Sequence, residues 1–283
     1  MFSCSDKKSE PSFRTGMVQA GSMSIYYEIH GKGDPVLLLH AGLQTHSMWD
    51  EQVKALSADH EVITIDLPRH GRSVGSDTTT LVQEMILTVL DSLKVEKAAV
   101  ASLSLGASVA QDFVIAYPNR VLKLILMSSG VNGIENIYKV DSISSAWYPA
   151  FAVASDSNRL EEAALIFAKA WGDGLDAQDS LVKPSSKFVY ATTLDNLKKH
   201  NKEFWPKFRE TPPAVESIKT IRVPVLIIHG DRDLPFINQT SKFLEKSIPG
   251  AQRVMLPGLA HMINLEQPKE INKLMEEFLK KKD

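Results

Sequence analysis

A chain of 283 residues, 43% of them hydrophobic and 23% charged, is long enough for one α/β domain with a sizeable insertion. Its formal net charge of −2 gives no basic field for nucleic acid or an anionic membrane. Cys4 is the only cysteine, which excludes an internal disulfide and a cysteine metal cluster, and no apolar run reaches the roughly eighteen residues of a membrane span.

The start of the chain, residues 1–16, is predicted to be a flexible polar tail ahead of the first strand. No signal peptide is present in the sequence as given, so a soluble, cytoplasmic domain is expected. The alternative is a bacterial lipoprotein, because Cys4 lies where the acylated cysteine of a mature lipoprotein lies. That alternative makes Cys4 a candidate lipid anchor and requires a signal upstream of it.

Strand and helix patterns alternate through the first half of the chain. A hairpin is expected first, from Val18–Ala20 and Met23–His30 with a turn at Gly21-Ser22. Continuous apolar runs, typical of parallel strands covered on both faces, follow at Val36–His40, Glu61–Asp66, Ala98–Ala101 and Val121–Met127. Helical patterns between them cover Met48–Leu56, Leu81–Leu93 and the segment after Ser104 to about Tyr117.

The strand pattern stops after residue 131 and resumes after Pro213. Segment 132–219 has helical patterns at Leu160–Trp171 and Ala191–Phe208 and is predicted to be an inserted helical cap. It is rich in aromatic residues, of which most are expected in the core of the cap and one or two at the site: Trp147, Tyr148, Phe151, Trp171 and Trp205. Strands Val223–Ile228 and Gln252–Leu256 then return, each followed by a helix: Gln239–Ser247 and Glu270–Lys280. Residues 17–131 and 220–283 are therefore predicted to form a mostly parallel, doubly wound α/β sheet.

Ser104 lies between the buried strand at Ala98–Ala101 and a helical pattern. Ser102 and Gly106 flank it at two residues on either side, which is the spacing of a nucleophile elbow. In such a turn the serine is held in a strained conformation, and its flanks are small because neighbouring backbone passes close by. A hydroxyl nucleophile also needs a base within reach and a carboxylate that fixes the tautomer of that base.

His261 and the aspartates Asp231 and Asp233 supply these groups. Both aspartates follow the strand Val223–Ile228, and His261 follows the strand Gln252–Leu256. Since open α/β sheets bind ligands beyond the carboxyl ends of their strands, Ser104 and these side chains are expected to converge there. The residues alone leave both aspartates open as the acid.

Five motifs in this order resemble those of the α/β-hydrolase fold family, of the capped kind, over roughly Met17 to Lys280. They are His40-Ala41-Gly42, the loop Asp66–Ser73 of the type D-x-x-G-x-G-x-S, Ser102–Gly106, Gly230–Asp233 and His261–Pro268. The resemblance implies that Ser104 is the nucleophile, His261 the base and Asp233 the acid. It also implies that the backbone N–H groups of Gly42 and Leu105 form the oxyanion hole.

The sequence departs from the family pattern at a few glycines, where Ala41, Ser102 and Ala260 stand instead, all of them small. Arg69 replaces a further glycine in the loop Asp66–Ser73. A serine nucleophile argues against haloalkane dehalogenases and epoxide hydrolases, whose relatives use aspartate at that position.

The remaining histidines have simpler predicted roles. His40 and His70 are expected to hold loops together, as they do in this family. His46 is expected to lie at the surface, with a contact to substrate as the alternative. No metal is predicted, because no two histidines have metal-ligand spacing on one element. No cofactor is predicted either.

The predicted reaction is hydrolysis of a carboxylic ester or a similar small acyl substrate through an acyl-enzyme. The same triad acts in relatives on carbon–carbon bonds, on lactones or with peroxide, and nothing in the cap sequence separates these reactions. A receptor-like binding protein of this fold is a further alternative, because some receptors retain an intact triad. The expected partner is a small acyl molecule, with no nucleic acid involved.

Overall fold

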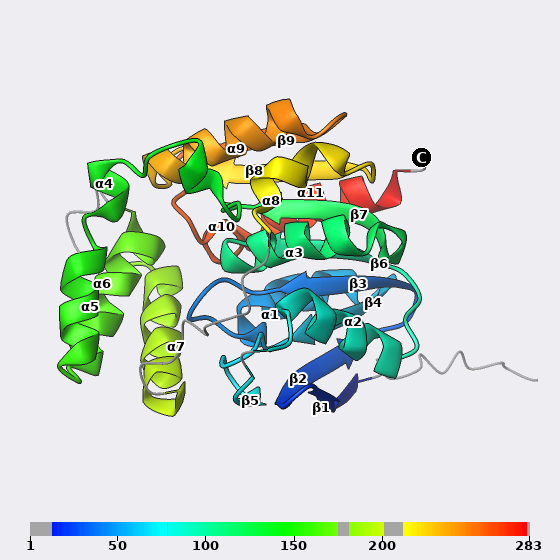
Figure 1. Ribbon diagram of the computed structural model, residues 1–283, viewed down its shortest axis with the longest axis horizontal. Coiled ribbons are helices and arrows are strands. Elements are labelled where there is room, and N and C mark those ends of the chain that lie inside the picture. The colour runs from blue at the N-terminus through cyan, green and yellow to red at the C-terminus, as the bar shows by residue number, and fades with distance from the viewer. Residues whose placement is uncertain (1–12, 78, 175–180, 201–211, 282–283) are drawn as a thin grey trace, which may run out of the picture.

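The computed structural model describes residues 13–77, 79–174, 181–200 and 212–281. Its centre is one sheet in the order β1-β2-β4-β3-β6-β7-β8-β9, and β5 pairs with β2 (Figure 1). The strands are β1 (Phe13–Ala20), β2 (Met23–His30), β3 (Asp34–Leu39), β4 (His60–Ile65), β5 (Val74–Gly75), β6 (Ala98–Leu103), β7 (Val121–Met127), β8 (Val225–Gly230) and β9 (Gln252–Leu256).

The sheet is antiparallel at one edge and parallel across the rest. Strands β1 and β2 form a hairpin with Ala20 opposite Met23, so the turn at Gly21-Ser22 is confirmed. The first strand begins at Phe13, five residues before the predicted Val18, so residues 13–16 belong to the sheet and not to the flexible tail expected for residues 1–16. Strand β2 pairs antiparallel with β4, and every pairing from β4 across to β9 is parallel. The mostly parallel α/β sheet expected from the sequence is therefore correct.

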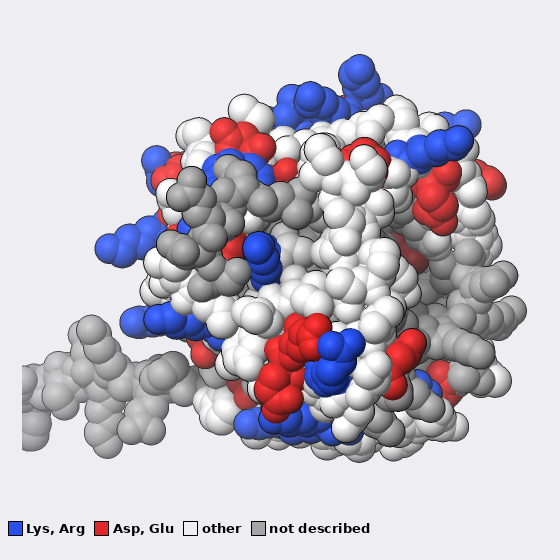
Figure 2. Space-filling model, turned by 90° about the vertical axis from the view of Figure 1, so that its left-hand side faces the viewer, with Lys and Arg blue, Asp and Glu red and all other residues white. Residues whose placement is uncertain are grey.

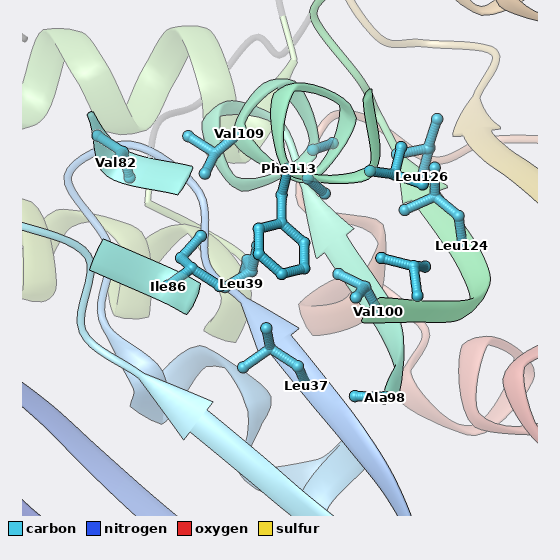
Figure 3. Packing of buried hydrophobic residues seen from close by; sticks show 14 of the residues in the cluster. Leu37, Leu39, Val82, Ile86, Ala98, Val100, Val109, Phe113, Leu124 and Leu126 are labelled. Atoms are coloured by element: carbon cyan, nitrogen blue, oxygen red, sulfur yellow. The ribbon is translucent and has the colours of Figure 1, made fainter. Parts of the chain in front are cut away.

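Helices cover both faces of the sheet, which explains why its strands are continuous apolar runs. Because side chains alternate along a strand, Leu37 and Leu39 of β3 pack in one cluster, with Phe113 of α3 (Figure 3). Val36 and Leu38 belong to the cluster on the opposite face. The helices around the sheet are α1 (Asp50–Leu56), α2 (Val82–Ser92), α3 (Leu105–Ala116), α9 (Pro235–Ser247), α10 (Ile263–Glu266) and α11 (Pro268–Lys280).

Between β7 and β8 the described residues form helices and turns, and α4 to α7 gather beyond one end of the strands (Figure 1). The pattern at Leu160–Trp171 is a helix followed by a π-helical turn, Lys169–Asp173. The second expected helix, Ala191–Phe208, overlaps α7, but α7 begins seven residues before Ala191, and Phe208 lies outside the described residues. The helices here are α4 (Ser142–Ser145), α5 (Tyr148–Asp156), α6 (Leu160–Ala168), α7 (Pro184–His200) and α8 (Ala214–Ser217).

Helix α7 is fixed to the loops at the carboxyl ends of β3 and β4. The buried amide of Asn196 donates to the carbonyl oxygen of Leu43 at 3.0 Å and accepts from the N–H of Gly71 at 2.7 Å. Gln44 donates to the hydroxyl of Thr193 at 3.1 Å. These contacts place the helical segment over the edge of the sheet where the candidate catalytic residues were expected.

The outer surface of the helical segment carries several exposed apolar side chains, and uncharged atoms cover much of that end of the molecule (Figure 2). They are Ile137, Val140, Ile143, Tyr148, Val153, Leu165 and Val182. Among the described residues, no helix has the length and apolar character needed to cross a membrane. Cys4, the candidate lipid anchor, lies outside the described residues.

Candidate active site

Ser104 occupies a tight turn between β6 and α3, with φ 55° and ψ −113°. A non-glycine residue in such a conformation costs about 1–3 kcal/mol, which the surrounding structure must offset. Gly106 permits the turn, because a Cβ there would overlap the carbonyl oxygens of Leu39 and His40. Ser102 fits in place of the usual glycine because its hydroxyl donates to Ile125 O, 3.0 Å away on β7.

His261 and Asp233 form a buried pair at the ends of the last two strands. Nδ1 of His261 lies 2.9 Å from both carboxylate oxygens of Asp233, and both side chains are almost completely buried. Because an ionised carboxylate only accepts, Nδ1 carries the proton and Nε2 is left as the basic nitrogen. The N–H of Leu234 donates to Asp233 Oδ1 at 2.7 Å and fixes the carboxylate in place.

Asp231, the other aspartate of the turn, bonds to backbone groups and not to His261. Its Oδ1 accepts from the N–H of Gly258 at 2.7 Å, and its own N–H donates to Leu256 O at 3.1 Å. It therefore joins the loop after β8 to the loop after β9. Asp231 therefore has the role of a turn residue. Of the two aspartates that the sequence left open as the acid, Asp233 is the one that contacts His261.

A cavity of about 50 Å³ opens beside Ser104. Gly42 and Leu105, the two residues expected to supply the oxyanion hole, are both part of its wall. Leu105 is the first residue of α3, so its N–H belongs to the helix end that has no intrahelical acceptor and favours negative charge. The lining residues are Gly42, Ser104, Leu105, Trp147, Phe167, Trp171, His261 and Met262.

The five predicted site residues lie together: Gly42, Ser104, Leu105 and His261 line the cavity, and Asp233 bonds to His261. The hydrogen bond between Ser104 and His261 is the one expected contact that is not formed. His261 Nε2 is buried without a hydrogen-bond partner in the described part of the chain, so it is not bonded to the hydroxyl of Ser104. Catalytic hydrogen bonds are often long or misaligned in an unliganded site and tighten when substrate binds. The arrangement can support transfer of a proton from Ser104 to His261 once that contact closes.

The other side of the cavity is aromatic and comes from the helical segment. Trp147 packs edge-on against Phe167 and Trp171, with ring centroids 5.8 Å and 5.5 Å away. The ring of Trp171 also contacts that of His261, at 4.4 Å between centroids. The sequence indicated an aromatic cap but did not distinguish cavity-lining rings from buried ones, and Phe167 was missed. The position of Trp205 lies outside the described residues.

His40 supports the loop that carries Gly42. Its Nε2 accepts from the N–H of Leu67 at 2.8 Å, so Nδ1 carries the proton and donates to Ala41 O at 2.7 Å. Burial lowers the pKa of His40 to about 4 and that of His70 to about 3, which keeps both rings neutral. His70 bonds to Pro68 O at 3.0 Å. Both histidines hold loops, as expected.

His46 does not lie at the surface, which corrects the expectation from the sequence. Its side chain is 12% exposed and lies between Asp66, at 2.8 Å, and Glu28, at 3.3 Å. Burial opposes its charged form, but the hydrogen bond to Asp66 and the charges of both carboxylates outweigh burial and raise the pKa of His46. The sequence could not reveal this, because the partners come from β2 and the loop after β4.

A nucleophile elbow, a buried histidine–carboxylate pair and a parallel sheet wound by helices define the α/β hydrolases. The sequence model of the alpha/beta hydrolase fold family matches residues 34–268. The chain belongs to this family and is a hydrolase.

Known proteins similar to this chain include hydrolases of several kinds. It is 26% identical to carboxylesterase YbfK of Bacillus subtilis over 257 residues, covering 86% of this chain and 79% of that protein. It is also 26% identical to 3-oxoadipate enol-lactonase 1 of Acinetobacter baylyi, over 87% of this chain and 89% of the relative. The crystal structure of esterase RhEst1 from Rhodococcus sp. ECU1013 superposes with a TM-score of 0.79 at 23% identity, covering 95% and 98% of the two chains.

Proposed function

We propose that this hydrolase cleaves carboxylic esters with a short acyl group through a covalent intermediate on Ser104. The contact that carries the proposal is the buried pair of His261 and Asp233 beside the cavity that Ser104 lines. This pair leaves Nε2 of His261 as a base within the same cavity. The relatives named as a carboxylesterase and an enol-lactonase support acyl chemistry at the site.

The reaction proceeds in two steps. Ser104 Oγ attacks the ester carbonyl while His261 Nε2 takes its proton, and the N–H groups of Gly42 and Leu105 stabilise the oxyanion. The C–O bond to the alcohol then breaks, and His261 returns the proton to the leaving oxygen. Water next attacks the acyl-enzyme with His261 as base, which releases the acid and restores Ser104.

The size of the cavity supports a small acyl group. Sites for drug-sized ligands hold about 300–1,000 Å³, whereas the space beside Ser104 is about 50 Å³. Three aromatic rings bound this space, so lengthening the acyl chain requires the cap side to move. Acetyl and butanoyl esters are therefore the expected substrates, ahead of octanoyl esters.

Labelling with a fluorophosphonate and hydrolysis of p-nitrophenyl acetate test the proposal. Replacing Ser104 by alanine is expected to abolish labelling and to lower kcat/KM by roughly 10⁴-fold or more. Ser102→Ala is the matched control, because it removes a neighbouring hydroxyl that bonds within the sheet. It is expected to keep labelling and most of the activity.

The same assays separate the alternatives. Esterase activity that persists in Ser104→Ala would contradict the nucleophile assignment. A stable adduct in the wild-type protein without turnover would favour a receptor-like binding protein. Faster turnover of a lactone, of a carbon–carbon substrate or of acetate with peroxide, all dependent on Ser104, would keep the triad and replace the substrate class.

A further inference from the structure

Trp171 lies in an irregular stretch of the cap that is hydrogen-bonded to α7. The stretch is the π-helical turn Lys169–Asp173, and such turns inside helices are frequent at functional sites. Asp173 at its end is buried and accepts from the hydroxyl of Ser186 and from the N–H of Leu181, the latter at 3.0 Å. These contacts hold the turn that carries Trp171, and the Trp171 ring itself packs against that of Trp147, at 5.5 Å between centroids.

The indole N–H of Trp171 is buried without an acceptor among the residues that the structure describes. Burying a donor with no acceptor is unfavourable, and such groups in folded proteins call for an explanation. Of the described residues that line the cavity, two carry a buried side-chain nitrogen without a hydrogen-bond partner, Trp171 and His261. Their rings touch each other. The partner of the histidine nitrogen comes with the reaction, through Ser104 and the substrate.

Trp171 differs from another tryptophan whose buried indole N–H has no acceptor among the described residues, Trp49, in that it lines the cavity. Trp49 also has a buried indole N–H without an acceptor in the described part of the chain, yet it packs in the hydrophobic core. Trp49 does not line the cavity, so nothing that enters there reaches it. Trp171 combines an unsatisfied donor with a place in the wall of the cavity and a contact to the base.

We propose that the indole N–H of Trp171 is a hydrogen-bond donor to the substrate, which carries an acceptor oxygen besides those of the ester. This inference rests on the proposed esterase function. An ether, hydroxyl or carbonyl oxygen in the acyl or alcohol part satisfies the donor, whereas a hydrocarbon chain of the same shape leaves it unpaired. A site that hydrogen-bonds part of its substrate discriminates against the analogue lacking that group, because the buried group is then left unsatisfied.

Esters that differ only by an oxygen in place of a methylene group test the inference. One pair varies the acyl part, p-nitrophenyl methoxyacetate against p-nitrophenyl butanoate. The other varies the alcohol, 2-methoxyethyl acetate against butyl acetate. For at least one pair, Trp171→Phe is expected to lower the ether-to-methylene ratio of kcat/KM by about fivefold to tenfold, mainly through KM. Comparing ratios between proteins cancels the different intrinsic reactivities of the esters.

Trp49→Phe is the matched control, because it removes a buried indole N–H away from the cavity and is expected to leave both ratios unchanged. Binding of the same esters to Ser104→Ala, with and without Trp171→Phe, gives a readout without turnover. The ether esters are expected to bind about fivefold more weakly when Trp171 is replaced, and the hydrocarbon esters equally well.

The outcomes of these measurements are distinct. Ratios and affinities that stay within about twofold for both pairs would overturn the role of Trp171, even in an active esterase. Failure of the wild-type protein to hydrolyse any ester would overturn the proposed function instead. The binding comparison in Ser104→Ala would still decide whether Trp171 donates to the ligand.

Discussion

The two walls of the cavity come from different parts of the chain and are built in different ways. The wall from the sheet presents Ser104, His261 and the backbone of Gly42 and Leu105, all at the ends of parallel strands. The wall from the helical segment presents the rings of Trp147, Phe167 and Trp171. In the proposed reaction the first wall carries out proton transfer and stabilises the oxyanion, whereas the second mainly offers apolar surface. We therefore expect the sheet to determine the reaction and the helices to determine the substrate.

Polar contacts hold the two walls together. Glu266 accepts from the N–H of Ala260, directly before His261, at 2.9 Å and pairs with Lys183 at 2.8 Å. Asn196 of α7 joins the loops that contain Leu43 and Gly71. Substitutions confined to one wall should consequently leave the other in place, and this allows the comparison to be tested.

The largest expected effect among these changes concerns Asp233, the proposed acid of the sheet wall. Asparagine in place of Asp233 keeps the shape but favours the wrong tautomer of His261, so kcat is expected to fall by roughly 10²–10⁴-fold. The upper figure is the value measured for the equivalent change in a serine protease. Activity on p-nitrophenyl acetate measures the loss, and circular dichroism checks that the fold is retained.

Asp231→Asn is the matched control for this change. Its side chain accepts one backbone hydrogen bond from Gly258, which an amide oxygen can also accept, so a loss of less than about tenfold is expected. If Asp231→Asn shows the larger loss of kcat instead, the assignment of Asp233 as the acid is wrong. Equal losses in both variants would point to the turn as a whole.

The sheet wall could be predicted from the sequence because its residues occupy fixed positions in strand–turn–helix units. Ser104 follows a recognisable buried strand, and His261 follows another, so their convergence results from the parallel sheet. The choice between Asp231 and Asp233 came from the family resemblance, since spacing along one turn does not determine which carboxylate faces a distant loop.

The helical wall could be predicted only in outline. Aromatic content indicated a cap, but which rings face the cavity depends on packing between helices that are distant in sequence. Helix α7 began earlier than predicted, and its buried face includes the polar Thr193 and Asn196, whose partners lie about 150 residues away. A search for apolar periodicity does not recognise such a face. The same long-range pairing hid the largely covered position of His46 between Asp66 and Glu28.

A change in the helical wall should alter the substrate preference and spare the chemistry. Phe167→Ala enlarges the cavity and is expected to raise the octanoate-to-acetate ratio of kcat/KM by about tenfold, within the range known for added methylenes. Phe167→Leu provides a milder variant if the alanine protein does not fold. Leu165→Ala, on the exposed side of the same helix, is the control. An unchanged chain-length profile in folded Phe167 variants would show that the helices do not determine the substrate.

The smallest expected effect concerns the pH dependence of stability. His46 and His70, in the loops after β3 and β4, should contribute to stability with opposite dependences on pH. The pKa of His46 is raised in the folded state, so its stabilising contribution is complete below the unfolded value of about 6.5 and is lost as pH rises through the folded pKa. The pKa of His70 is lowered to about 3, so its neutral form contributes fully above about pH 6.5 and the contribution is lost as pH falls toward 3.

Denaturant unfolding from about pH 5 to 8.5 measures both effects in the wild type, His46→Gln and His70→Gln. The stability difference from the wild type should shrink with rising pH for His46→Gln and with falling pH for His70→Gln. Parallel trends in the two variants would mean that the carboxylates Asp66 and Glu28 do not hold His46 in its charged form.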